Sequence, residues 1–222
     1  KLRNAKTELY GGELVAPFEC PERLDHVLGR LKEVGLGDIA QPDNFGLEPV
    51  LRIHDPNYVN FLQVCWDDWQ AAGNKGEAVP TMWPTRGLRQ DRVPNYIDGR
   101  LGYYALAGET SFCEGTWEAA YVSANVALSA AKLISSGERS AFALCRPPGH
   151  HAARDLFGGY CFLNNAAIAA QSLLDGGANR IAILDVDFHH GNGTPDIFYG
   201  ARSGLFASPP AGPLAPFPLF LA

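Results

Sequence analysis

The segment Ile181-Ala-Ile-Leu-Asp-Val-Asp-Phe-His-His190 decides the fold class of this 222-residue chain. It opens with a short, continuously apolar run, which is typical of a strand buried inside a parallel sheet. A second apolar run, at 141–145, leads directly into Arg146-Pro-Pro-Gly-His-His151. Ala-rich helical patterns at 116–135 and 165–174 alternate with the two runs. We therefore predict an α/β fold, a three-layer αβα domain with a central, mainly parallel sheet that helices cover on both faces.

The sequence before residue 116 predicts two more helices and one long excursion. Apolar residues at helical spacing indicate a helix from Pro21 to about 34 that stops at Gly35, and a helix from Pro56 to about 72 with Asp55 as its cap. From residue 73 to 97 neither period is present. Because a long loop inside a compact domain often has a function, we expect an active-site rim or an oligomer contact here, with a variable surface loop as the alternative.

Charge, hydropathy and cysteine spacing weigh against several functional classes. With 18 basic and 24 acidic residues the formal charge is −6, so we expect no nucleic-acid partner. No run approaches the roughly 18 to 20 apolar residues of a membrane-spanning helix, so we expect no membrane partner. The five cysteines are widely spaced and form no Cys-x-x-Cys pair, which favours a reducing, cytoplasmic location.

Chemically capable side chains gather just after the two apolar runs, where four of the six histidines lie. Alternate residues of an extended segment share a face, so Asp185, Asp187 and His189 point the same way if the strand continues. A carboxylate oxygen and an imidazole nitrogen suit zinc, and Fe(II) and Co(II) accept the same mixture. A catalytic zinc still requires a third protein ligand.

His150 and His151 could supply the base and the acid of a hydrolysis near neutral pH. Asp185 would orient one of them, and the amide of Asn192 the other. Any one of these residues alone could be merely structural. Two other readings remain open, namely a cysteine hydrolase that uses Cys145 or Cys161 with His150, and a non-catalytic remnant that keeps Asp187 and His189 as a partial metal site.

Three motifs resemble the signature of the histone deacetylase superfamily: Arg146-Pro-Pro-Gly-His-His151, Gly158-Gly-Tyr-Cys-Phe-Leu-Asn-Asn165 and Asp185-Val-Asp-Phe-His-His-Gly-Asn-Gly-Thr194. Within this superfamily, residues 1–13 and the 73–97 excursion most resemble the bacterial acetylpolyamine amidohydrolases. The resemblance runs from residue 1 to about Tyr199 and implies the arginase/deacetylase-like form of the α/β fold.

The resemblance implies roles for individual residues. Asp187 and His189 would be zinc ligands, and His150 and His151 the acid–base pair oriented by Asp185 and Asn192. The other implied positions are Gly159 and Tyr160 along a narrow substrate tunnel, Asp185, Asp187, His189 and Ser208 around a structural K⁺ or Na⁺, and Arg23 beneath the metal, with a helix-surface salt bridge as its alternative.

The implied activity is zinc-dependent removal of acetyl groups from amines. Acetylated polyamines are the expected substrates, with acetyl-lysine as the second choice. Glu8, Asp98 and Glu109 would form a carboxylate rim near the tunnel mouth or the dimer interface, with solvated surface charge as the alternative. A homodimer through the 73–97 loop is the expected assembly, in which Met82 and Trp83 pack against the partner or cover the core.

The carboxyl-terminal part departs from the family pattern. The family's third zinc ligand, an Asp, and the tyrosine that polarises the carbonyl are both expected later than Ala222. Pro209 and Pro210 stand where a Leu-His pair is expected, which would interrupt a strand. We therefore expect residues 1–222 to be a single catalytic domain that is truncated at both ends or frame-damaged, with a divergent tail at 201–222. A product that stops after Ala222 would be expected to be inactive.

Overall fold

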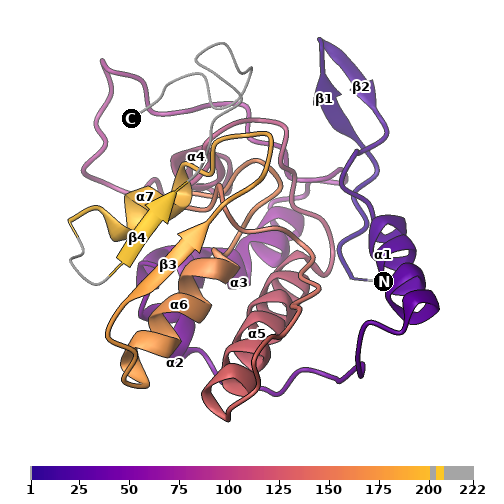
Figure 1. The fold of residues 1–222 in the computed structure, drawn as a ribbon. Helices are drawn as coiled ribbons and strands as arrows, with labels where there is room; N and C mark the ends of the chain where they lie inside the picture. Colours follow the sequence, from indigo (N-terminus) through magenta and orange to yellow (C-terminus); the bar gives the residue numbers. More distant parts are fainter. Residues whose placement is uncertain (1, 201–203, 208–222) are drawn as a thin grey trace.

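The computed structural model of this protein describes residues 2–200 and 204–207 (Figure 1). An antiparallel strand pair comes first, helices make up most of the middle of the chain, and a short parallel strand pair lies in its last described part. The elements in chain order are β1 (Glu8–Tyr10), β2 (Glu13–Val15), α1 (Pro21–Val34), α2 (Glu48–Leu51), α3 (Pro56–Ala71), α4 (Ile97–Tyr103), α5 (Thr116–Ser135), α6 (Asn165–Asp175), β3 (Ile181–Leu184), α7 (Gly193–Phe198) and β4 (Gly204–Ala207).

The four predicted helices are confirmed, with bounds that differ by at most one residue from those expected. Helix α3 starts where expected because the Asp55 side chain accepts hydrogen bonds from the backbone N–H groups of Asn57 and Tyr58, at 2.8 and 3.3 Å. Helix α1 ends at Gly35, whose φ of 61° is left-handed. Helices α5 and α6 pack against each other, and aromatic rings such as those of Phe61, Phe112 and Phe157 fill the core beside α3.

The predicted α/β class is confirmed by a parallel strand pair packed against a helix. Strand β3 pairs with β4 over the four residue pairs from Ile181↔Gly204 to Leu184↔Ala207, and α6 packs against β3 (Figure 1). The strand ends at Leu184, and the expected continuation to 187 is wrong. Within the described residues β3 is not covered on both faces, because Ile181 and Ile183 are half-buried whereas Ala182 and Leu184 are exposed.

The strand predicted at 141–145 is also wrong. This segment is extended, but it makes no ladder with any strand in the described part of the chain. The Cys145 N–H instead donates to the carbonyl of Ala143, only two residues away, at 3.0 Å. Phe142 is 62% exposed. Apolar character alone therefore does not form a strand here, because no neighbouring strand satisfies the backbone polar groups.

The segment between α3 and α4 contains no helix and meets the body of the protein at a few close approaches. A single β-bridge joins Ala78 to Phe112. Gly102 of α4 lies so close to the Met82 carbonyl that a Cβ atom there would overlap it. Farther along the segment Leu88 is 61% and Tyr96 84% exposed. The homodimer through 73–97 stays a prediction, which these exposed side chains motivate and light scattering on the purified protein would check.

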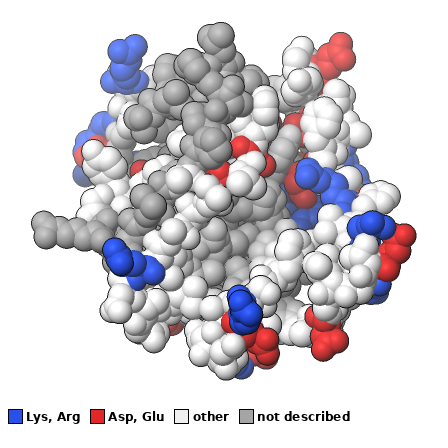
Figure 2. Space-filling view, viewed as in Figure 1, with Lys and Arg blue, Asp and Glu red and all other residues white. Residues whose placement is uncertain are grey.

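The distribution of surface charge and the length and polarity of the helices are relevant to nucleic-acid and membrane binding, neither of which the sequence predicts. On the face shown in Figure 2, the Lys and Arg side chains of the described residues are scattered among acidic ones and do not gather into one broad basic area. Among the described residues, every helix is too short or too polar to cross a bilayer.

His54 ties the start of α6 to the segment that precedes it. Its side chain is buried, its Nε2 accepts from the backbone N–H of Asn164 at 3.0 Å, and its Nδ1 lies 3.3 Å from the carbonyl of Arg154. Burial lowers the pKa of His54 to about 4, so the ring is neutral at pH 7 and donates from Nδ1. Asn164 in turn caps α6 by accepting from the N–H of Ala167 at 3.1 Å. These contacts fix α6 relative to the histidine turn before it.

Candidate active site

The turn at 146–151 lies against the start of α6 and the middle of α5. The carbonyl of Pro147 accepts from the Ser123 hydroxyl at 2.9 Å and from the Asn165 side-chain amide at 3.1 Å. Gly149 permits this close approach, because a Cβ atom there would lie 2.6 Å from the backbone nitrogen of Asn165. Two rigid helices therefore hold the turn that presents His150 and His151.

The two histidines form a contacting pair, and each has its own oxygen partner. Their ring centroids are 4.0 Å apart. Nδ1 of His150 lies 2.9 Å from Oδ2 of Asp185, and Nδ1 of His151 lies 2.7 Å from Oδ1 of Asn192. Because both partners are acceptors, Nδ1 of each ring is the donor and Nε2 is the basic atom. The structure thus brings together the four residues predicted to be catalytic.

The surroundings of the pair favour a neutral His151. Burial and the neighbouring His150 lower the pKa of His151 to about 4, although the hydrogen bond to Asn192 acts in the opposite direction. Burial alone would raise the pKa of Asp185. The hydrogen bonds from His150 and from the N–H of Asp187 outweigh it and hold this pKa below its ordinary value. Asp185 is therefore ionised at pH 7 and can balance a positive charge on His150.

Two glycines allow this packing. A Cβ atom on Gly191 would overlap Oδ2 of Asp185 and would lie 2.9 Å from Nδ1 of His150. A Cβ atom on Gly159 would lie 2.7 Å from Cγ of His151, and the φ of Gly159 is 53°. The loop also closes through its backbone, since the N–H of Gly193 donates to the carbonyl of His150 at 3.0 Å. The sequence motifs contain Gly191 and Gly193 but predict no role for either residue.

Asp187 and His189 lie together beside the histidine pair and fit part of a zinc shell. Oδ1 of Asp187 lies 3.3 Å from Nδ1 of His189 and accepts the His189 backbone N–H at 2.8 Å. Both side chains are about half exposed, and the ring centroids of His189 and His151 are 6.3 Å apart. One carboxylate and one imidazole are the donor types that zinc takes. Within the described residues no group of three His, Cys, Asp or Glu side chains completes a site.

The loop that carries Gly159 and Tyr160 contacts two of the three carboxylates predicted to bind the substrate. The Tyr160 hydroxyl donates to Oε1 of Glu8 at 2.6 Å, and the N–H of Gly159 donates to Oε1 of Glu109 at 2.7 Å. Burial, with the hydrogen bond to Glu8 and the nearby carboxylates, raises the pKa of Tyr160, so its hydroxyl remains a donor. The carboxylates of Glu8 and Glu109 therefore lie against the loop that touches His151.

Other predicted positions are not brought to this cluster. Asp98 is exposed on α4, and Arg23 is exposed in the first turn of α1. Ser208 lies outside the described residues, so the cation site expected from Asp185, Asp187, His189 and Ser208 is represented only by its first three members.

The cysteine alternative has little support from the geometry. Sγ of Cys161 donates to the carbonyl of Gly159 at 3.3 Å, and Sγ of Cys145 donates to the carbonyl of Ser123 at 3.4 Å. Burial raises the pKa of Cys161 to about 12 and that of Cys145 to about 11. Both thiols are therefore protonated at neutral pH, whereas a cysteine nucleophile must be a thiolate.

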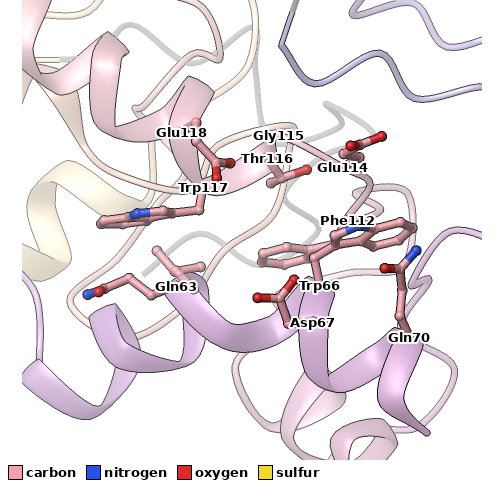
Figure 3. Close-up of a pocket in the computed structure, with 11 residues that line it drawn as sticks. Gln63, Trp66, Asp67, Gln70, Phe112, Glu114, Gly115, Thr116, Trp117 and Glu118 are labelled. Atoms are coloured by element: carbon pink, nitrogen blue, oxygen red, sulfur yellow. The ribbon is translucent and has the colours of Figure 1, made fainter.

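A hollow between α3 and α5 is separate from this cluster (Figure 3). It encloses about 240 Å³, and its walls include the indole rings of Trp66 and Trp117 and the carboxylates of Asp67, Glu114 and Glu118. None of the residues that the sequence predicts to be catalytic, metal-binding or substrate-binding lines this hollow.

Comparison with known proteins matches residues 17–219 to the histone deacetylase domain. The chain belongs to the histone deacetylase family. It is 58% identical over its whole length to the acetylpolyamine amidohydrolase of Mycoplana ramosa and 54% identical to acetylpolyamine amidohydrolase 2 of Pseudomonas aeruginosa. In both cases it spans 64% of the relative's length.

Solved structures agree with this assignment. The acetylpolyamine aminohydrolase of Burkholderia pseudomallei superposes with a TM-score of 0.86 and 37% identity, covering 93% of this chain and 59% of that one. The HDA15 HD domain superposes with a TM-score of 0.67 and 25% identity, covering 91% of this chain and 50% of that one. The predicted arginase/deacetylase-like fold of this histone deacetylase family member is therefore confirmed.

Proposed function

We propose that this chain provides the acid–base part of a zinc-dependent deacetylase that hydrolyses acetylated amines. The observation that carries the proposal is the histidine pair at 4.0 Å, with Asp185 on one ring and Asn192 on the other. One partner is a carboxylate and the other a neutral amide, so the two imidazoles differ in the charge that they tolerate. Such a difference suits one base and one charged neighbour in the same site.

Asp187 and His189 would hold the zinc ion. When bound, zinc would lower the pKa of a water molecule and polarise the acetamide carbonyl. The third ligand and the carbonyl-polarising tyrosine that the family resemblance implies are expected later than Ala222.

The chain's own residues carry the proton transfers. Neutral His151 takes a proton at Nε2 as water adds to the acetyl carbonyl, and Asn192 holds the donor on the opposite ring nitrogen. The C–N bond then breaks, and the same proton passes to the departing amine. His150, which donates from Nδ1 to the Asp185 carboxylate, would stabilise the negative charge that develops on the carbonyl oxygen.

Acetylated polyamines are the proposed substrates, with acetyl-lysine as the second choice. The partly exposed Glu109 carboxylate beside Gly159 supports a cationic amine, since a carboxylate makes a strong charge-assisted contact with an ammonium group. Glu8 is 4% exposed and both of its oxygens accept hydrogen bonds from the protein, so it would act on the amine through its charge. The relatives named as acetylpolyamine amidohydrolases agree with acetylated polyamines as substrates.

A cytoplasmic location stays a prediction, supported by five cysteines that are all free.

The test is acetate release from an acetylated polyamine by the full-length protein. We expect hydrolysis that a chelator abolishes and that added zinc restores, and that a thiol reagent leaves unchanged. Hydrolysis that resists the chelator but stops with the thiol reagent would establish the cysteine alternative. Zinc binding without any turnover would support the non-catalytic remnant.

A further inference from the structure

Three charged side chains form a buried cluster beside the histidine turn. Glu19 lies between two guanidinium groups, with its Oε2 at 2.7 Å from Nη1 of Arg3 and its Oε1 at 2.7 Å from Nε of Arg146. The exposed fractions are 2% for Arg3, 5% for Glu19 and 10% for Arg146. A single carboxylate thus separates two buried positive charges.

Arg146 connects the cluster to the turn that carries the catalytic pair. It immediately precedes Pro147, and its Nη1 and Nη2 donate to the carbonyls of Leu2 and Arg3 at 3.1 and 2.8 Å. The guanidinium of Arg3 also lies over the ring of Phe162, 4.9 Å from the centroid. The cluster therefore joins the first residues of the chain, Glu19 and the beginning of the turn.

A second set of contacts leads from Glu19 to Glu8, one of the carboxylates predicted to bind the substrate. The N–H of Phe18, the residue before Glu19, donates to Oε2 of Glu8 at 3.2 Å. Oε1 of the same carboxylate accepts the Tyr160 hydroxyl at 2.6 Å. Tyr160 follows Gly159, which packs on the ring of His151. One continuous network thus runs from the beginning of the turn, through Glu19 and Glu8, back to the catalytic ring.

Glu19 is the only acidic member of this three-residue cluster. Without its charge, Arg3 and Arg146 would repel each other in a site from which water is largely excluded. Relief of that repulsion requires Arg3 or Arg146 to move. Movement of Arg146 shifts the histidine turn, and movement of Arg3 pulls on Arg146, whose Nη2 donates to the Arg3 carbonyl. A shift of Glu19 moves the neighbouring Phe18 N–H, which binds Glu8.

We propose that Glu19 is a positioning residue, which holds the His150–His151 turn and the Glu8 carboxylate in one arrangement. This inference rests on the proposed deacetylase function. Glu19 would then affect both the rate of the chemical step and the preference for a cationic substrate.

The first test compares two substrates in the full-length protein, an acetylated polyamine and an uncharged N-acetyl amide. In Glu19→Gln we expect kcat to fall about 10²-fold on both, because a displaced acid–base group costs this much. We also expect the ratio of kcat/KM for the cationic to the uncharged amide to fall about 10-fold, as is typical when a supporting contact is lost. Glu19→Asp, which keeps the charge on a shorter side chain, should recover part of both losses.

The ratio separates positioning from a loss of folded protein. Leu128→Ala is the matched control, because Leu128 is a core residue of α5 that is 1% exposed and its truncation destabilises the fold. Fewer folded molecules lower both rates equally, so the ratio should not change in this variant. If Glu19→Gln does not fold, Arg146→Lys tests the same network, because lysine keeps the charge but loses the fork that holds two carbonyls.

Hydrogen exchange provides a readout that needs no activity. In Glu19→Gln the amides of Phe18 and Gly193, which bond to Glu8 and to the His150 carbonyl, should exchange at least about 10-fold faster, while amides within α5 stay protected. An unchanged ratio together with unchanged exchange would overturn the inference. If the wild type hydrolyses neither substrate, the proposed function fails, and the exchange result alone then supports or refutes the positioning role.

Discussion

Replacement of His151 by alanine is expected to lower kcat on an acetylated amine by about 10²- to 10⁴-fold, the usual contribution of a general acid–base group. The ring is removed from a site where burial makes the pKa of His151 about 4, so that it is a neutral base at pH 7. A water molecule in the vacated space would not replace the imidazole as a base, because water lacks the oriented Nε2 of the ring. The measurement is steady-state hydrolysis, with circular dichroism to confirm that the fold is retained.

Asn192→Ala is the graded companion to this variant. It leaves His151 in place but removes the Oδ1 acceptor at 2.7 Å that fixes the ring tautomer. We expect a smaller loss of about 10- to 100-fold. A His151→Ala protein that keeps its kcat within threefold of the wild type would exclude His151 as the base.

Gly191→Ala is expected to lower kcat about 10²-fold through a single added methyl group. That methyl would overlap Oδ2 of Asp185 and meet His150, so the hydrogen bond between them would have to break. Displacement of a catalytic group by about 1 Å costs roughly this much. The backbone of Gly191 does not have the positive φ that favours glycine, so the effect tests the space beside His150 and not backbone strain.

Gly37→Ala is the matched control, because a Cβ atom there meets nothing within 4 Å and its φ is also not positive. Its rate should equal that of the wild type. Normal hydrolysis by Gly191→Ala would mean that the close packing around Asp185 and His150 is not required for catalysis.

Helices could be predicted from the sequence because their signals are local. Asp55 and Gly35 mark ends by contacts within a few residues, and apolar spacing marks the buried face. The apolar run at 141–145 is different. A strand requires a partner elsewhere in the chain, and composition alone does not reveal whether that partner is present.

The candidate site follows the same division. The motifs place His150 and His151 after one apolar run and Asp185 and Asn192 after the other, and side-chain chemistry predicts that Asp185 and Asn192 orient the histidines. Which histidine takes which partner could not be predicted, because it depends on how the two segments pack. The part played by Glu19 could not be predicted, because its contacts with Arg3 and Arg146 join residues that are 16 and 127 positions apart. Likewise Asp98 and Glu8 look alike as acidic residues, yet only Glu8 reaches Tyr160.

The central claim is that His151 is a neutral base held with its donor on Nδ1, and nitrogen NMR of the imidazole rings tests it most directly. In the wild type at pH 7 we predict a proton on Nδ1 of His151 and none on Nε2, with protonation of the ring only as the pH falls towards about 4. An Nε2–H tautomer, or a ring already charged at pH 7, would contradict the account.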